Sequence, residues 1–244
     1  MFDAFSTQTT LVLVIAALIT SAISGMLGMA GGVTLLGVMA SILPPKTVVP
    51  LHGVVQLASN LTRTFAYRHD VRWKYFFAFA APAVIGMALA TRLWSAEKLT
   101  FFRLWVGVFI LAFLVYRRYK PSLSDLPTWV YPVLGFVVGA LAIFVGATGP
   151  LLAPFFLRKD FSKENVIATK AICQMWVHIL KVPAFLSLAF DYRPFVGELA
   201  LLIVSVIVGT YIGKSLLSRL STKRFLFVFQ FVLPAIHLIV DAIR

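Results

Sequence analysis

The stretch Gly25-Met26-Leu27-Gly28-Met29-Ala30-Gly31-Gly32 places four glycines within eight residues of a hydrophobic segment. Residues 4–45 around it contain no Asp, Glu, Lys or Arg. A second break, Gly146-Ala147-Thr148-Gly149-Pro150, lies in another charge-free stretch. Each break is followed by a short apolar run, 33–43 or 149–157, whereas a membrane span needs about 20 residues. The two breaks predict broken or re-entrant Gly-rich helices, which stop and restart within a membrane.

The composition of the whole chain favours a membrane protein. Of its 244 residues, 60% are hydrophobic and 13% are charged, whereas about one-quarter of a soluble domain is charged. We predict an all-α, polytopic helical bundle of 8–10 membrane segments, with no length left for a soluble domain. Ten hydrophobic stretches are expected, at 8–27, 33–43, 47–67, 73–93, 99–116, 128–146, 149–157, 164–190, 195–215 and 224–242.

The formal net charge of +13 is explained by topology, because Lys and Arg are retained in cytoplasmic loops. We assume that the N-terminus is outside and that each short run returns the chain to the side it left. Then 13 of the 22 basic residues fall in inside loops and six in outside loops. We therefore predict a multi-pass protein of the cell inner membrane, with the lipid bilayer but no nucleic acid as a partner.

The chain also contains a weak internal repeat with an offset of 118 residues. Gly28 and Gly31 match Gly146 and Gly149, and Gln56 matches Gln174. Polar matches inside apolar segments are not readily supplied by chance. A shift in a later loop then aligns Gly86 with Gly209.

We therefore divide the chain into an N-terminal membrane repeat at 1–120, a cytoplasmic linker at 121–127 and a C-terminal membrane repeat at 128–244. Each repeat makes an odd number of net crossings, so the second has inverted topology, as in many transporters. The alternative is two parallel four-helix units, and it would put the basic residues of 214–224 outside, which the charge rule disfavours.

Two of the expected helices carry polar stripes with spacings of 4, 4 and 3 residues, which keep the side chains on one helix face. The stripes are His52, Gln56, Asn60 and Arg63, and Lys170, Gln174, His178 and Lys181. A central Lys or Arg in lipid costs about 2.5–3.5 kcal/mol, so each stripe must face protein or water. We interpret the stripes as a polar path whose cations attract an anion. The alternative is interhelical hydrogen bonding, worth about 0.6–2 kcal/mol each.

The helices that restart after the breaks would point unpaired N–H groups and a partial positive charge at the same region. Such ends bind anions readily. The expected substrate-binding residues are Gly31, Gly32, His52, Gln56, Asn60, Arg63, Thr148, Gly149, Lys170, Gln174, His178 and Lys181. Close helix packing better explains the remaining glycines of interest, which are Gly25, Gly135, Gly139, Gly209 and Gly213.

These features together resemble the sulfite exporter TauE/SafE family of membrane permeases. The resemblance is carried by the glycine-rich stretch at 25–32, the segment from Pro50 through Tyr67 to Val71-Arg72-Trp73, Gly86, and the repeated half around Gly146 to Gly149. It covers nearly the whole chain and implies the movement, usually outward, of sulfite, sulfonates and related organic anions. The second repeat has Gly149-Pro150 where the first has Gly31-Gly32, which argues against equal ligand contacts from the two halves.

We therefore expect a secondary transporter that exports a small anion by alternating access. An anion channel would use the same stripes and is the alternative, followed by a membrane enzyme or assembly factor. The sequence contains no nucleophile motif, paired catalytic carboxylates or metal-ligand cluster, so we expect neither an enzyme nor a cofactor. The two histidines titrate in a range that suits a coupling proton, and no oligomeric state is predicted.

Overall fold

The computed structural model describes residues 4–93 and 126–221, and every regular element in those ranges is helical. The expected segments 99–116 and 224–242, and all of the expected linker except its last two residues, lie outside the described residues. In chain order the helices are α1 (Thr7–Leu27), α2 (Gly31–Ile42), α3 (Pro45–Ala66), α4 (Trp73–Arg92), α6 (Val130–Val145), α7 (Gly149–Phe156), α8 (Lys163–Ser187) and α9 (Val196–Ser218). Each lies within a few residues of an expected stretch, which confirms the all-helical prediction for this part of the chain.

Three segments of the described residues are long and apolar enough to cross a membrane: Thr7–Leu27, Trp73–Arg92 and Arg193–Ser218. Helices α3 and α8 have 22 and 25 residues but carry the polar stripes. Helices α2 and α7 have only 12 and 8 residues, so they extend about 18 and 12 Å at 1.5 Å per residue. Both are shorter than a hydrocarbon core of about 30 Å.

The two glycine breaks end α1 and α6 in the same way. Gly28 follows α1 with a φ of 73°, and its N–H donates to the Ser24 carbonyl at 2.8 Å. Gly146 follows α6 with a φ of 75°. Residues with a Cβ rarely adopt this left-handed conformation, so glycine suits both positions. The breaks thus redirect the chain into α2 and α7, as their glycines predict.

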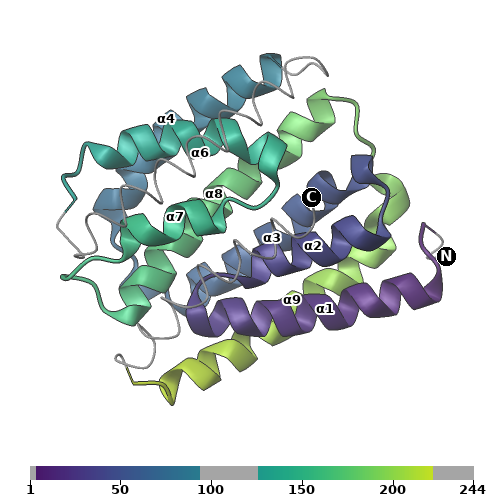
Figure 1. Ribbon diagram of the computed structural model, residues 1–244, viewed down its shortest axis with the longest axis horizontal. Helices are drawn as coiled ribbons and strands as arrows, with labels where there is room; N and C mark the ends of the chain where they lie inside the picture. Colours follow the sequence, from purple (N-terminus) through teal and green to yellow (C-terminus); the bar gives the residue numbers. More distant parts are fainter. Residues whose placement is uncertain (1–3, 94–125, 222–244) are drawn as a thin grey trace.

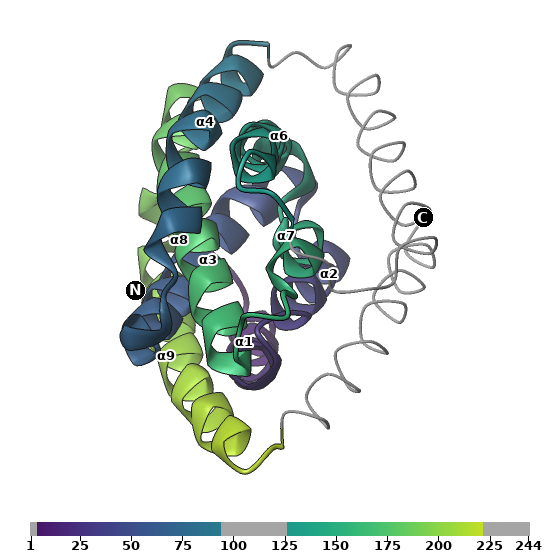
Figure 2. The same cartoon turned by 90° about the vertical axis from the view of Figure 1, so that its left-hand side faces the viewer.

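The helices pack in two layers, which Figure 2 shows edge on. One layer contains α4, α8, α3 and α9 in that order, and the other contains α6, α7, α2 and α1. Helices α3 and α8 are therefore central in their layer. The short helices α2 and α7 lie against them, which brings both glycine breaks next to both polar stripes.

Helices α1 and α9 pair along one side of the bundle, and α4 and α6 pair along the other (Figure 1). The α1–α9 pair is parallel, because Gly209 lies against Leu18 and Gly213 lies against Gly25. The same contacts recur between the other two helices.

The α4–α6 pair is parallel too, because Gly135 lies against Phe79 and Gly139 lies against Ala83. A Cβ on any of the glycines at these two helix contacts would run into the backbone of the other helix.

The contacts of Gly25, Gly135, Gly139, Gly209 and Gly213 confirm that they serve close helix packing.

Several basic loops meet at one end of the bundle, which we call the basic end: the ends of α3 and α9 and the starts of α4 and α8. Lys214 Nζ donates to the Ala66 carbonyl at 2.6 Å. Lys163 Nζ donates to the Leu217 and Leu220 carbonyls at 3.2 and 2.6 Å. The end of α3 thus shares a level with the start of α8, so these two helices run antiparallel.

Candidate anion-binding site

A small cavity lies between the middles of α3 and α8, at the two glycine breaks. Its volume is ≈ 10 Å³, room for about one water-sized molecule. It is lined by Ser24, Gly28, Met29, Ala30, Gly32, Val33, His52, Gln56, Arg63, Ala147, Gly149, Pro150, Lys170, Gln174 and His178. Both layers and both halves of the chain contribute to this lining.

Most of the expected binding residues meet at this cavity. Those in its lining are Gly32, His52, Gln56, Arg63, Gly149, Lys170, Gln174 and His178. The other four expected residues, Gly31, Asn60, Thr148 and Lys181, are not part of the lining. Gly31 packs on α1 at Thr20 and Ser24, and Thr148 is the N-cap residue of α7. Asn60 Nδ2 donates to the Gln56 carbonyl at 2.8 Å, within its own helix.

The starts of α2 and α7 open onto the cavity without a capping side chain. Each has a glutamine amide against it. A Cβ built on Gly32 would lie 3.1 Å from Gln56 Oε1, and one built on Gly149 would lie 2.9 Å from Gln174 Nε2. The cavity therefore faces two uncapped helix N-termini, and each carries a partial positive charge.

The two glutamines are not placed identically. In the expected repeat, Gly149 matches Gly31, whereas Gln56 lies against Gly32. Pro150 occupies the position that matches Gly32 and has no N–H to donate. The glutamine contact is therefore shifted by one residue between the two halves of the site, and the second half has one fewer backbone N–H donor. Both differences follow from Gly149-Pro150 standing where the first half has Gly31-Gly32.

Three cationic side chains are buried at or beside the cavity. Lys170 Nζ donates to the Gly28 carbonyl and Lys181 Nζ to the Gly146 carbonyl. Arg63 Nη2 donates to Ser59 Oγ at 2.9 Å. All three residues are 2% exposed or less. Among the described residues, none of them has an ion pair with a carboxylate, so no acidic side chain there offsets the charge that these groups carry when protonated.

The two lysines follow a pattern that the sequence did not indicate. Gly28 and Gly146 are matched positions, and their carbonyls come directly after α1 and α6, where a helix carries its partial negative charge. Both lysines belong to α8, so the same helix donates to the glycine carbonyls of both breaks. Lys170 also lines the cavity, whereas Lys181 does not.

His52 of α3 and His178 of α8 face each other, with ring centroids 6.3 Å apart at an interplanar angle of 71°. His52 Nε2 donates to the Gly32 carbonyl at 2.7 Å, which leaves its Nδ1 as an acceptor. The Nδ1 atoms of both rings are buried and have no hydrogen-bond partner among the described residues. Both rings therefore have hydrogen-bonding capacity to spare at the cavity.

The expected binding residues did not include seven residues of the lining: Ser24, Gly28, Met29, Ala30, Val33, Ala147 and Pro150. Ala30 adopts a φ of 76° as the N-cap residue of α2, an uncommon conformation for a residue with a Cβ. The glycine pattern predicted the break but not this turn, since an alanine carries no signal for it.

The sulfite exporter TauE/SafE family model matches residues 13–238. The match spans both glycine breaks, both polar stripes and all the helix pairs described above. No curated protein and no solved structure matches the chain. Because the family match covers most of the 244 residues, this chain belongs to the sulfite exporter TauE/SafE family.

Proposed function

We propose that this protein is a secondary transporter of the inner membrane that exports a small anion, either sulfite, a sulfonate or a related organic anion. Its family is one of exporters, which favours transport over an enzymatic reaction. The observation that carries the proposal is the central cavity, where two uncapped helix N-termini, two glutamine amides and the Lys170 ammonium converge. An oxyanion would find hydrogen-bond donors and positive potential there from several directions.

The packing supports two inverted repeats, in which α1, α2, α3 and α4 correspond to α6, α7, α8 and α9. A Cβ on Gly86 would meet the Phe136 carbonyl and Ala140 N, and one on Gly209 would meet the Leu18 carbonyl and Ala22 N. Leu18 and Ala22 precede Phe136 and Ala140 by the same 118 residues that separate the other matches. The α4–α6 contact is therefore repeated, residue by residue, at α9–α1.

The helix directions support the inversion. Helices α1 and α3 run parallel, since Ser21 Oγ lies 3.2 Å from Ser59 Oγ and the Tyr67 hydroxyl donates to the Gly25 carbonyl. Helices α4 and α8 are likewise parallel. The Arg72 N–H donates to Thr169 Oγ1 near the start of both helices, and further along both of them Trp176 Nε1 donates to the Ala80 carbonyl. Hence α1, α3 and α9 run one way and α4, α6 and α8 the other. Among the described helices, each matched pair of long helices points in opposite directions, and we propose α2 and α7 as re-entrant segments.

The size of the cavity is what a carrier with its site closed would show. A volume of ≈ 10 Å³ is too small for sulfite, which has four heavy atoms, so binding requires the surrounding helices to move. Alternating access supplies such a movement, with one repeat shifting against the other around the site. An inside-negative potential favours anion efflux by about 2.3 kcal/mol per charge per 100 mV, so export needs no ATPase.

The first test removes the two amides. We expect Gln56→Ala and Gln174→Ala each to raise the KM for sulfite flux in proteoliposomes by about tenfold or more, because a hydrogen bond to a charged group is worth about 1.5–3 kcal/mol. Asn60→Ala is the matched control, since Asn60 lies one turn from Gln56 and is buried, but donates to its own helix. Undiminished flux in both glutamine variants would rule out the proposed site, and saturating flux would distinguish the carrier from a channel.

We further propose that a proton moves with the anion and that His52 and His178 carry it, because their unpaired Nδ1 atoms lie at the cavity. Among the described residues, Lys181 and Arg63 are the cationic groups whose charge acts on the pair, and Lys170 shares the cavity lining with both histidines. The double variant His52→Gln/His178→Gln should still export sulfite down its gradient, but the internal pH of the liposome should change by a different amount per sulfite moved than with the wild type, because no coupled proton leaves. The readout is a trapped pH dye recorded alongside sulfite flux. Unchanged proton movement in this variant would contradict the assignment.

A further inference from the structure

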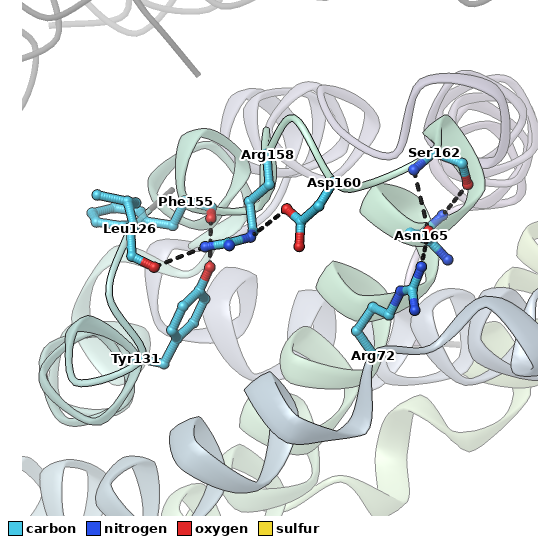
Figure 3. A network of polar contacts seen from close by, with 8 residues as sticks. All are labelled: Arg72, Leu126, Tyr131, Phe155, Arg158, Asp160, Ser162 and Asn165. Carbon is cyan, nitrogen blue, oxygen red and sulfur yellow. Dashed lines mark hydrogen bonds and ion pairs between the residues drawn. The ribbon is translucent and has the colours of Figure 1, made fainter. Parts of the chain in front are cut away.

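A second cavity, unrelated to the central one, opens at the basic end. This groove has a volume of ≈ 520 Å³ and lies between the start of α4 and the connection from α7 to α8. Its lining residues are Val71, Arg72, Trp73, Lys74, Tyr75, Asp160 and Phe161. None of them lines the central cavity. Figure 3 shows Arg72 and Asp160 on the two elements that border the groove.

The groove carries excess positive charge. Its acidic residue, Asp160, is neutralised by Arg158, whose Nε lies 2.8 Å from Asp160 Oδ1 (Figure 3). Arg72 is held in place by a hydrogen bond from Nη2 to Asn165 Oδ1 at 3.1 Å. Within residues 4–93 and 126–221, neither Arg72 nor Lys74 forms an ion pair. Two cations therefore line the groove, Arg72 held by Asn165 and Lys74 without a hydrogen bond or ion pair to the described residues.

The start of α4 adds donors to this charge. Arg72 is the N-cap residue of α4 and makes no side-chain capping bond. The start of the helix, whose residues Trp73 and Lys74 line the groove, therefore carries a partial positive charge without a side-chain cap. A phosphate suits such a combination of helix N-terminus, arginine and lysine.

Aromatic residues place the groove at the depth of lipid head groups. Trp73 is the first residue of a candidate membrane span. Its ring is half exposed and stacks on Phe77, 5.8 Å away, which is 66% exposed on the next turn. Tryptophan at the end of a span marks the membrane–water interface. The groove thus opens beside an apolar surface that the acyl chains of a lipid can cover.

We propose that this groove binds the phosphate of an anionic phospholipid head group at the cytoplasmic face. The phosphate contacts Arg72, Lys74 and the start of α4, and the acyl chains lie along Trp73 and Phe77. Such a lipid is a bound partner and not the exported anion, so the inference goes beyond the proposed transport function. Free inorganic phosphate shares the same chemistry, and the experiment distinguishes the two sources.

The experiment measures lipid binding to the purified full chain in neutral detergent by native mass spectrometry. Phosphatidylglycerol is compared with phosphatidylcholine of the same acyl chains. The variants are Lys74→Gln and Arg72→Gln/Lys74→Gln. The matched control is Arg68→Gln/Arg219→Gln, which removes two exposed charges from the basic end but outside the groove. We expect each groove charge to contribute about fivefold to the preference for phosphatidylglycerol, and the control to retain most of it.

Equal losses in the groove and control variants, or no preference in the wild type, would overturn the proposal. Displacement of the lipid by an equal concentration of inorganic phosphate would assign the groove to a free oxyanion and overturn the proposal that it binds a phospholipid. If Arg72→Gln fails to fold, Lys74→Gln alone decides, because Lys74 makes no hydrogen bond or ion pair with the described residues. The assay involves no flux, so its failure leaves the transport proposal standing.

Discussion

Replacing Lys170 with methionine should lower sulfite flux by about 10- to 100-fold and leave the protein at least as stable as the wild type. Lys170 is 1% exposed and lines the central cavity, and its Nζ donates to the Gly28 carbonyl. A hydrogen bond from a charged group is worth about 1.5–3 kcal/mol to a ligand, which corresponds to this loss of flux. Flux at subsaturating sulfite in proteoliposomes measures it.

The stability half of this prediction follows from the cost of burying charge. Among the described residues Lys170 has no carboxylate partner, and a buried charge without one is expensive. Methionine has nearly the same length without the charge, although it leaves the Gly28 carbonyl without its donor. Thermal unfolding in detergent should therefore show an unchanged or raised midpoint. A variant that loses flux and stability together would indicate that Lys170 only supports the break.

Lys181→Met is the control for this experiment. Lys181 is on the same helix, is fully buried, and donates to Gly146, the matched glycine of the other break. It does not line the cavity. We expect less than a threefold change in flux, and equal losses in the two lysine variants would contradict a specific role for Lys170 at the anion.

The second large effect concerns the adjacent glycines at the start of α2. Gly31→Ala should prevent the protein from folding, because the added Cβ would overlap the Thr20 carbonyl and lie 2.5 Å from Ser24 Oγ. The Thr20 carbonyl is backbone of α1 and cannot rotate away. The cost therefore falls at the upper end of overpacking penalties, which is about 3 kcal/mol or more. The monodisperse yield after size exclusion in detergent measures the loss.

Gly32→Ala is the matched variant, since it adds the same methyl group one residue later. There the Cβ meets Gln56 Oε1 at 3.1 Å, the end of a side chain that can rotate. We expect this variant to fold in normal yield and to show a raised KM for sulfite, because the amide is displaced from the cavity. Equal yields for the two alanine variants would show that the close approach of Gly31 to α1 is not required.

The helices could be predicted from the sequence because apolar length and charge-free runs determine where a chain enters a membrane. The stripe face was predictable too, since a spacing of four and three residues holds on any α-helix. The role of each residue in the two stripes could not be predicted. Asn60 is short enough to bond to its own helix, and Lys181 is long enough to reach a carbonyl beyond the cavity. Those choices depend on side-chain reach and on the packing of α2 and α7, which the spacing does not contain.

The pairing of α1 with α9 and of α4 with α6 also has a consequence for biosynthesis. Each half of the chain buries its glycine faces against the other half, so neither half can complete this packing by itself. At about 5–20 residues per second, roughly 3–10 s pass between the completion of α4 at Arg92 and of α6 at Val145. The interval from Leu27 to the end of α9 at Ser218 is roughly 10–40 s. Until then α1 lacks its partner α9, and its packing face remains exposed to lipid, to the insertion machinery or to other helices.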